Sequence, residues 1–246
     1  MRNAEFGKWN EGGRTTPVVL ITGAGRGIGG ATARAFAAKG YRVVLAERST
    51  GLGKRTEQTL AKAGTTALFI QTDVSSQLSV RRSVAATNQC FGRLDCLVNN
   101  AGVLSVGPLH RLSVRDLGEM LAVNLRGTLL MARAAIPHML RQRSGAIINV
   151  ASQLGKYGLA DYVTYCATKF GVIGLTQALA SELSGTGIRV WAVCPGLTDT
   201  PMAAKTGVSS GERAGLIRPE TVARAIVDLA LNRRHEASGA ALDITR

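Results

Sequence analysis

The stretch "YCATK" at residues 165–169 places a phenol and an ammonium four positions apart in a segment of helical character. On a helix, side chains at this spacing share a face, with Cβ atoms about 5–6 Å apart. A free phenol has a pKa of about 10 and is a poor base at neutral pH. A nearby cation stabilises the phenolate and lowers that pKa. The pair Tyr165 and Lys169 is therefore predicted to move a proton at a substrate oxygen.

Two other polar residues are placed to assist such a step. Ser152 follows a strand-like apolar run, at the carboxyl end where open α/β sheets hold ligands, so its hydroxyl could orient a substrate oxygen. Asn124 lies in a helical segment, and its amide could hold a water beside Lys169. Taken singly, these residues equally suit structural roles. Cys166 has no histidine near it in sequence and is interpreted as a packing residue.

A glycine-rich turn is the first feature of the sequence that indicates a bound ligand. The segment 18–48 runs strand, glycine-rich turn, helix, strand, as a dinucleotide-binding unit does. Glycines let the backbone approach a phosphate, and the N-terminus of the following helix favours anions. The spacing fits G-x-G-x-x-G through Gly25, Gly27 and Gly30, and equally T-G-x3-G-x-G through Thr22, Gly23, Gly27 and Gly29.

The choice of dinucleotide depends on the end of the second predicted strand. Glu47 can accept both ribose hydroxyls and repels a 2′-phosphate, whereas the adjacent Arg48 would attract that phosphate. Arg26 in the turn is a further phosphate partner. The sequence favours NAD over NADP, and NADP stays open.

The elements that must position these residues alternate regularly. Near-continuous apolar runs indicate strands covered on both faces. Strand–helix alternation with short joints predicts one α/β domain of the Rossmann type, with a doubly wound, parallel, seven-stranded sheet and helices on both faces. A serine at 113 is a suitable helix cap. The strands are expected at 17–22, 42–47, 67–72, 96–100, 146–151, 188–194 and 239–245, and the helices near 28–39, 52–63, 76–91, 113–141, 161–184 and 219–231.

The amino-acid composition indicates what kind of protein this is. Of 246 residues, 46% are hydrophobic, enough for a sizeable core. The polar, aperiodic residues 1–16 are interpreted as a loose tail, 17–246 as the dinucleotide-binding catalytic domain, and about 198–218 as a substrate loop. No signal-peptide core or membrane-spanning run is recognised. The four cysteines and three histidines have no metal-ligand spacing, so no metal site is expected, and a reduced, cytoplasmic protein is favoured.

The formal net charge of +14 raises the question of a nucleic-acid partner. Such a partner would call for clustered basic residues with aromatics or a known motif, but aromatic residues make up only 4% of the chain and no such motif is present. No specific nucleic-acid or membrane partner is expected. A basic surface that attracts phosphorylated ligands is the simpler interpretation.

With these motifs in order, the sequence resembles the short-chain dehydrogenase/reductase family, in its single-domain branch that includes 3-oxoacyl reductases. The resemblance runs from about Pro17 to the last predicted strand. It rests on "TGAGRGIG" (22–29), "DV" (73–74), "NNAG" (99–102), Asn124, Ser152, "YCATK" and "PG" (195–196).

The resemblance implies roles for individual residues. Catalysis would fall to Asn124, Ser152, Tyr165 and Lys169, with Tyr165 as general acid and base. Asn99 would brace the central strands. The implied cofactor contacts are Thr22, Gly23, Gly25, Arg26, Gly27, Ile28, Gly29, Glu47, Arg48, Asp73 and Val74 on the adenosine side, and Asn100, Ala101, Gly102, Tyr165, Lys169, Pro195, Gly196, Thr198 and Thr200 along the cleft.

The substrate is expected to be a small-molecule secondary alcohol or ketone with an apolar body. A 3-oxoacyl thioester, a steroid-like ring and a polyol all remain open. The family pattern also implies a homodimer or homotetramer through the helices at 113–141 and 161–184. The short loop at 198–218 and the abrupt end after "SGAALDITR" depart from many relatives on the substrate side. Pocket residues are expected to be Val103, Leu104, Ser152, Gln153, Leu154, Leu159, Tyr162 and Met202.

Other functions fit part of the pattern. A dinucleotide-sensing binding protein without turnover would need the glycine turn but not both Tyr165 and Lys169. An NADPH-dependent 3-oxoacyl thioester reductase would use the same residues. A nucleic-acid-binding protein would use the charge, and an epimerase-like relative would share the fold and the tyrosine–lysine spacing, but the order of the motifs in so short a chain disfavours the epimerase. The sequence therefore predicts an oxidoreductase that transfers a hydride between a nicotinamide cofactor and a secondary alcohol or ketone.

Overall fold

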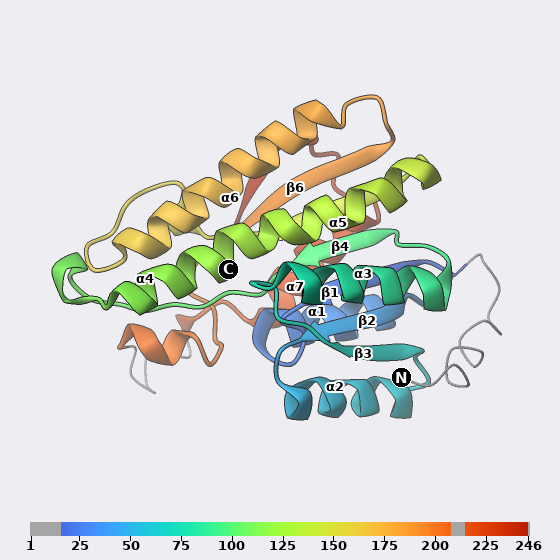
Figure 1. Ribbon diagram of the computed structural model, residues 1–246, viewed down its shortest axis with the longest axis horizontal. Coiled ribbons are helices and arrows are strands. Elements are labelled where there is room, and N and C mark those ends of the chain that lie inside the picture. The colour runs from blue at the N-terminus through green and yellow to red at the C-terminus, as the bar shows by residue number, and fades with distance from the viewer. Residues whose placement is uncertain (1–15, 208–214, 246) are drawn as a thin grey trace.

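The computed structural model describes residues 16–207 and 215–245. Seven parallel strands form one sheet in the order β3-β2-β1-β4-β5-β6-β7 (Figure 1). All five residues of β1 are buried, as continuous apolar runs in a doubly covered sheet should be. The predicted seven-stranded, doubly wound sheet is confirmed. The strands are β1 Val18–Thr22, β2 Arg42–Glu47, β3 Ala67–Gln71, β4 Cys96–Asn99, β5 Gly145–Val150, β6 Ile188–Pro195 and β7 Ala241–Ile244.

Helices cover both faces of the sheet. On one face, Phe36 of α1, Leu60 of α2 and Ile226 of α7 share a buried cluster with the strands. On the other, Val84 of α3 and Met131 of α5 belong to a second cluster that also includes residues of α6, and Figure 1 shows α3, α5 and α6 in front of the sheet. These helices are α1 Gly27–Ala37, α2 Thr50–Lys62, α3 Gln77–Phe91, α5 Gly127–Gln142, α6 Val163–Glu182 and α7 Pro219–Ala230.

The long helix expected at 113–141 is not uniform. It begins as α4 (Val114–Met120), widens into a π-helical turn at Leu121–Arg126, and continues as α5. The predicted cap is present, since Ser113 Oγ accepts a hydrogen bond from the Asp116 backbone N–H at 3.0 Å. Because one π turn hardly disturbs the hydrophobic pattern, apolar periodicity does not reveal it.

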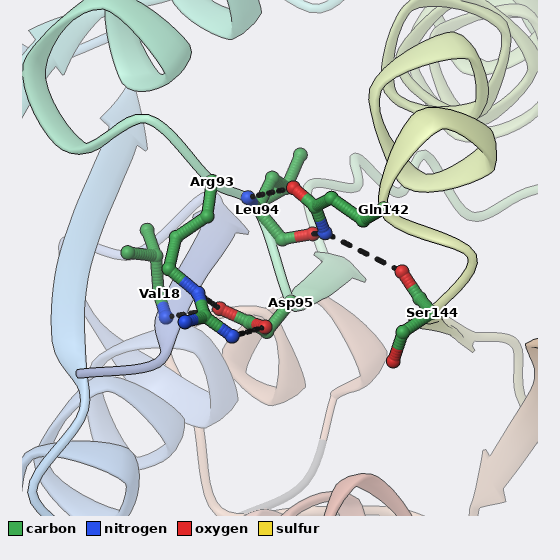
Figure 2. A network of polar contacts seen from close by, with 6 residues as sticks. All are labelled: Val18, Arg93, Leu94, Asp95, Gln142 and Ser144. Atoms are coloured by element: carbon green, nitrogen blue, oxygen red, sulfur yellow. Dashed lines mark hydrogen bonds and ion pairs between the residues drawn. The ribbon is translucent and has the colours of Figure 1, made fainter. Parts of the chain in front are cut away.

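A polar network fixes the amino-terminal edge of the sheet, away from the ligand side (Figure 2). Asp95 accepts a hydrogen bond from the Val18 backbone N–H at 2.8 Å and pairs with Arg93 at 2.6 Å. Gln142, the last residue of α5, bonds the backbone N–H of Leu94 at 2.9 Å and its carbonyl at 3.0 Å. These contacts hold the starts of β1 and β4 in register with the end of α5.

A second buried network crosses the centre of the sheet. Asn99 Nδ2 on β4 donates to Asn149 Oδ1 on β5 at 2.9 Å, and Asn149 Nδ2 donates to Thr176 Oγ1 on α6 at 2.9 Å. The expected bracing role of Asn99 is confirmed. The network ties α6, which carries Tyr165 and Lys169, to the two central strands.

Two predicted segments lie partly outside the described residues. Of the predicted tail at 1–16, only Thr16 is described, and 208–214 of the predicted substrate loop are not. All four cysteines are free and buried. Within the described ranges, the helices are too short or too polar to cross a membrane.

Candidate active site

A cavity of about 700 Å³ opens at the carboxyl ends of the strands. Its walls come from the segments that follow β1, β2, β3, β4, β5 and β6, as expected for a ligand site in an open α/β sheet. Of the predicted site residues, those that line it are Gly23, Arg26, Gly27, Ile28, Glu47, Arg48, Asp73, Val74, Asn100, Ala101, Gly102, Val103, Leu104, Ser152, Gln153, Leu154, Leu159, Tyr162, Tyr165, Lys169, Pro195, Gly196, Thr198, Thr200 and Met202.

Four predicted residues lie behind this surface: Thr22, Gly25, Gly29 and Asn124. Thr22 Oγ1 accepts hydrogen bonds from the backbone N–H groups of Asn100 at 2.9 Å and Ala101 at 3.0 Å, which locks the end of β4 against β1. At Gly29, a Cβ would lie 2.1 Å from the Gly23 carbonyl oxygen. These two positions shape the turn without facing the cavity.

The glycine turn has the features of an anion site. Gly23 and Gly27 have φ values of 63° and 54°, in the left-handed region that favours glycine. Helix α1 begins at Gly27, with no side-chain cap at Arg26 and no acidic residue in its first turn. The first N–H groups of a helix have no partner within it, so here they can bind an anion. Because Gly27 and Ile28 line the cavity, this donor set fits the pyrophosphate of a dinucleotide.

The far end of the cavity carries the groups expected at the adenosine. Glu47 accepts hydrogen bonds from the Gly25 backbone N–H at 3.1 Å and the Ser49 backbone N–H at 3.0 Å, so its carboxylate is fixed beside the turn. Arg48 pairs with Glu119 of α4 at 3.5 Å, and both side chains are substantially exposed. Glu119 is a cavity residue that the sequence did not suggest, because the pairing joins positions far apart in the chain.

Tyr165 and Lys169 share one face of α6, as their spacing predicted. Lys169 Nζ lies 5.5 Å from the centroid of the Tyr165 ring and donates a hydrogen bond to the Val150 carbonyl at the end of β5, at 2.8 Å. Lys169 is only 5% exposed. Ser152 lies two residues after β5 and hydrogen-bonds with the Tyr165 side chain. The structure thus brings Ser152, Tyr165 and Lys169 together at the cavity.

The electrostatics of this group differ from the expectation that Lys169 lowers the pKa of Tyr165. Burial raises the pKa of Tyr165 to about 12, and the hydrogen bond with Ser152 only partly offsets that rise. Burial also lowers the pKa of Lys169 to about 8, so part of the cationic charge is lost at mildly alkaline pH. In the protein alone, desolvation therefore outweighs the attraction between ammonium and phenolate, and Tyr165 is held as a protonated phenol.

Asn124 lies in the π-helical turn, and both the oxygen and the nitrogen of its side-chain amide form hydrogen bonds within the protein. Its Oδ1 accepts a hydrogen bond from the Val103 N–H at 2.8 Å, while its Nδ2 donates to the Val103 carbonyl at 2.9 Å and to Thr168 Oγ1 at 3.3 Å. Thr168 neighbours Lys169 on α6. The amide thus holds the segment after β4 against the helix that carries the tyrosine and lysine.

The substrate side of the cavity includes residues that sequence reasoning missed. Two short 3₁₀ turns form this wall: one at Gln153–Gly155 after Ser152, and one at Ala203–Thr206 after β6. Gln153, Leu154 and a substrate loop at about 198–218, which contains Ala203–Thr206, were predicted. Ser105, Tyr157 and Leu197 were not, because only the tertiary fold brings them to the cavity. The additional substrate-side lining residues include Ser105, Tyr157, Leu197, Pro201, Ala203, Lys205 and Thr206.

Comparisons with known proteins agree with this geometry. A family model described as short chain dehydrogenase matches residues 17–210. The chain is 39% identical over 237 residues to the cis-4-hydroxycyclohexanecarboxylate dehydrogenase of Sinomonas cyclohexanicum, covering 92% of this chain and 94% of that protein. The structure resembles 3-ketoacyl-(acyl-carrier-protein) reductase from Brucella melitensis complexed with NADH, with a TM-score of 0.87 at 32% identity over 93% of this chain and 96% of that one. It also resembles a variant of actinorhodin polyketide ketoreductase with NADPH, with a TM-score of 0.89 at 32% identity over 94% and 97% of the two chains.

Proposed function

This chain belongs to the short-chain dehydrogenase family, and we propose that it transfers a hydride between a nicotinamide dinucleotide and a secondary alcohol or ketone. The observation that carries the proposal is the meeting of Ser152, Tyr165 and Lys169 at the cavity that also contains the glycine turn. A sensing protein without turnover would not need this buried, hydrogen-bonded set, so the enzyme is the better interpretation.

The catalytic roles follow from the groups present. A bound nicotinamide supplies or accepts the hydride. In the reducing direction, Tyr165 donates its phenolic proton to the substrate oxygen. In the oxidising direction, Tyr165 must first lose its proton, and the phenolate then accepts the proton of the substrate hydroxyl. The Ser152 hydroxyl hydrogen-bonds the substrate oxygen and keeps it within reach of Tyr165. Lys169, held by the Val150 carbonyl, stabilises negative charge on the phenol oxygen as the proton leaves.

The cofactor is NAD or NADP, bound along the cleft between the turn after β1 and the segments after β4 and β6. Glu47 favours NAD, because its fixed carboxylate would repel a 2′-phosphate. Arg48 and Arg26 would favour NADP, but Arg48 is already paired with Glu119. We therefore propose NAD as the preferred cofactor. Asp73, whose Oδ1 accepts hydrogen bonds from the N–H and hydroxyl of Ser75, would contact the adenine.

The substrate pocket is proposed from the residues beyond the nicotinamide end of the cleft. Leu154, Leu159 and Met202 give it an apolar character, which suits a carbon body around the reacting carbinol. The relatives named above act on a ring hydroxy acid and on acyl-carrier thioesters, so an NADPH-dependent 3-oxoacyl thioester reductase stays the second candidate.

The exposed apolar side chains and the free cysteines indicate how the chain assembles and where it resides. Large apolar side chains are exposed along α5 and α6, among them Leu129 at 44% and Phe170 at 46%, which supports a homodimer or homotetramer through these helices. Four free, buried cysteines suit a reducing, cytoplasmic setting.

A substrate panel tests the proposed function. Ring and chain ketones, a 3-oxoacyl thioester and the matching alcohols are offered with NADH or NADPH, or their oxidised forms, and oxidation or reduction of the nicotinamide is followed. We expect turnover of at least one ketone, with higher kcat/KM for NADH than for NADPH. Tight binding of dinucleotide without turnover of any compound would favour the sensing protein.

A further inference from the structure

Lys205 places a positive charge on the substrate side of the cavity. It lies on the 3₁₀ turn Ala203–Thr206, and its Nζ donates a hydrogen bond to the Leu104 carbonyl at 3.0 Å. Both residues line the cavity, and they are separated by 101 positions in the sequence. The contact therefore brings the segment after β6 against the segment after β4.

This contact adjoins the segment that Asn124 holds in place. Leu104 follows Val103, whose backbone N–H and carbonyl both bond Asn124. Met202, three residues before Lys205, brings its Cε to 3.9 Å from the position of a Cβ on Gly102. The turn that carries Lys205 thus packs against the strip Gly102–Leu104, directly beside the cofactor cleft.

The acidic residues of the cavity wall are engaged elsewhere. Glu47 bonds backbone N–H groups, Asp73 bonds Ser75, Asp116 bonds Ser113 and Glu119 pairs with Arg48. Within residues 16–207 and 215–245, no carboxylate oxygen lies within 4.0 Å of the Lys205 ammonium. Every acidic residue of the wall therefore has a partner other than Lys205.

The remaining capacity of Lys205 suits an anion. An ammonium carries three N–H donors, and one of them is used by the Leu104 carbonyl. No other group of the described residues accepts a hydrogen bond from Lys205 Nζ, so the other two donors can bind a carboxylate, in a charge-assisted bond that is stronger than a neutral one. Leu154, Leu159 and Met202, which line the same cavity, are apolar, so the anionic group would be separated from the reacting carbon by a carbon body.

We propose that Lys205 binds a carboxylate of the substrate, and that the substrates are hydroxy acids or keto acids whose carboxylate lies away from the reacting carbon. This assignment rests on the proposed function and names its substrate class. A lysine that only fastens the turn to Leu104 would affect charged and neutral substrates alike, and this difference makes the proposal testable.

The test compares 4-oxocyclohexanecarboxylate with its neutral amide, 4-oxocyclohexanecarboxamide, on the full-length protein. Binding is measured by calorimetry with NAD⁺ present, because a ketone and an oxidised nicotinamide cannot react; kcat/KM is then measured with NADH and NADPH. Lys205→Met removes the charge and keeps the length, whereas Lys205→Arg keeps the charge. Lys62→Met on the exposed end of α2 removes the same net charge away from the cavity.

We expect the wild-type protein to bind the acid more tightly than the amide. Lys205→Met should weaken binding of the acid by roughly 10- to 100-fold and leave the amide nearly unchanged, as for the loss of a hydrogen bond to a charged group. Lys205→Arg and Lys62→Met should keep the preference. Equal losses for acid and amide, or no preference in the wild type, would overturn the role of Lys205. Absence of turnover with either cofactor would instead count against the proposed function, while the calorimetry still decides between acid and amide.

Discussion

The amine of Lys169 is buried between the Tyr165 ring and the end of β5. An ammonium without a carboxylate partner is costly to bury, which is why its pKa is lowered from 10.5 to about 8. A bound dinucleotide would offer ribose hydroxyls and a charged ring beside this amine. Lys169 Nζ bonds the Val150 carbonyl but pairs with no carboxylate among the described residues, so we infer that a bound dinucleotide would stabilise the charged amine further.

This burial gives stability a specific dependence on pH. Between pH 8 and 10.5 the unfolded chain holds a proton on Lys169 that the folded protein has lost, so the contribution of Lys169 to stability rises as pH increases through this window. Lys169→Met should remove this contribution. From pH 7 to pH 10, the free energy of unfolding of the wild type should increase relative to that of the variant by about 2 to 3 kcal/mol. Denaturant titrations across this range measure it, and parallel curves for the two proteins would contradict the lowered pKa.

Glu47 and Arg48 favour different cofactors. Glu47→Ala removes the carboxylate that would repel a 2′-phosphate and leaves Arg48 and Arg26 to attract it. The ratio of kcat/KM for NADP⁺ to that for NAD⁺ should rise by roughly 10-fold, in line with the loss of one unfavourable charge contact. Glu236→Ala, an exposed carboxylate away from the cavity, should leave the ratio unchanged. An unchanged ratio in Glu47→Ala would make Arg48 the residue that determines cofactor choice.

At the scale of elements, the π-helical turn joins the site to the fold. Asn124 projects from this turn to both backbone groups of Val103, and Thr128 Oγ1 donates to the Asn124 carbonyl at 2.8 Å. The turn therefore positions the wall after β4 and, through Thr168, the catalytic face of α6. In this geometry the side chain of Asn124 positions Val103 and Thr168.

Asn124→Ala tests that connection. The substitution leaves the Val103 N–H and carbonyl without partners in a poorly solvated place, and each lost partner costs about 1–3 kcal/mol. We expect a loss of about 2–4 kcal/mol in unfolding free energy, with a fall in kcat, measured by denaturant titration and steady-state kinetics. Thr59→Ala, which removes an exposed hydroxyl–backbone contact within α2, should leave both nearly unchanged. A stable Asn124→Ala protein with impaired kcat would instead support the expected water-holding role.

The same elements explain what the sequence could and could not predict. Parallel strands such as β1 were readable because they are continuous apolar runs, and Tyr165 with Lys169 because four residues form one helical turn. The π turn left no periodic signal. The contact of Lys205 with Leu104 and the pair of Arg48 with Glu119 join distant positions, so no local pattern revealed them. The raised pKa of Tyr165 depends on burial by the whole fold, which a motif does not specify.

At the scale of the whole molecule, the apolar side chains exposed on α5 and α6 are expected to be covered by a second copy of the chain. Phe170→Glu or Leu129→Glu would bury an unpaired charge in that contact and should yield a monomer, measured by light scattering during size-exclusion chromatography. Leu78→Glu on α3, which is 57% exposed on a different helix, should keep the wild-type mass. A monomeric wild type would refute the proposed assembly.

If the protein is a dehydrogenase of this kind, Tyr165 must transfer a proton to or from the substrate. Tyr165→Phe tests this directly. The ring and its packing beside Lys169 remain, and the transferable proton is lost. With the best substrate from the panel, we predict that kcat falls by about 10²- to 10⁴-fold, as for loss of general acid–base catalysis, while the dissociation constant for the dinucleotide changes little. Turnover at the wild-type rate by a variant that binds dinucleotide normally would contradict the account.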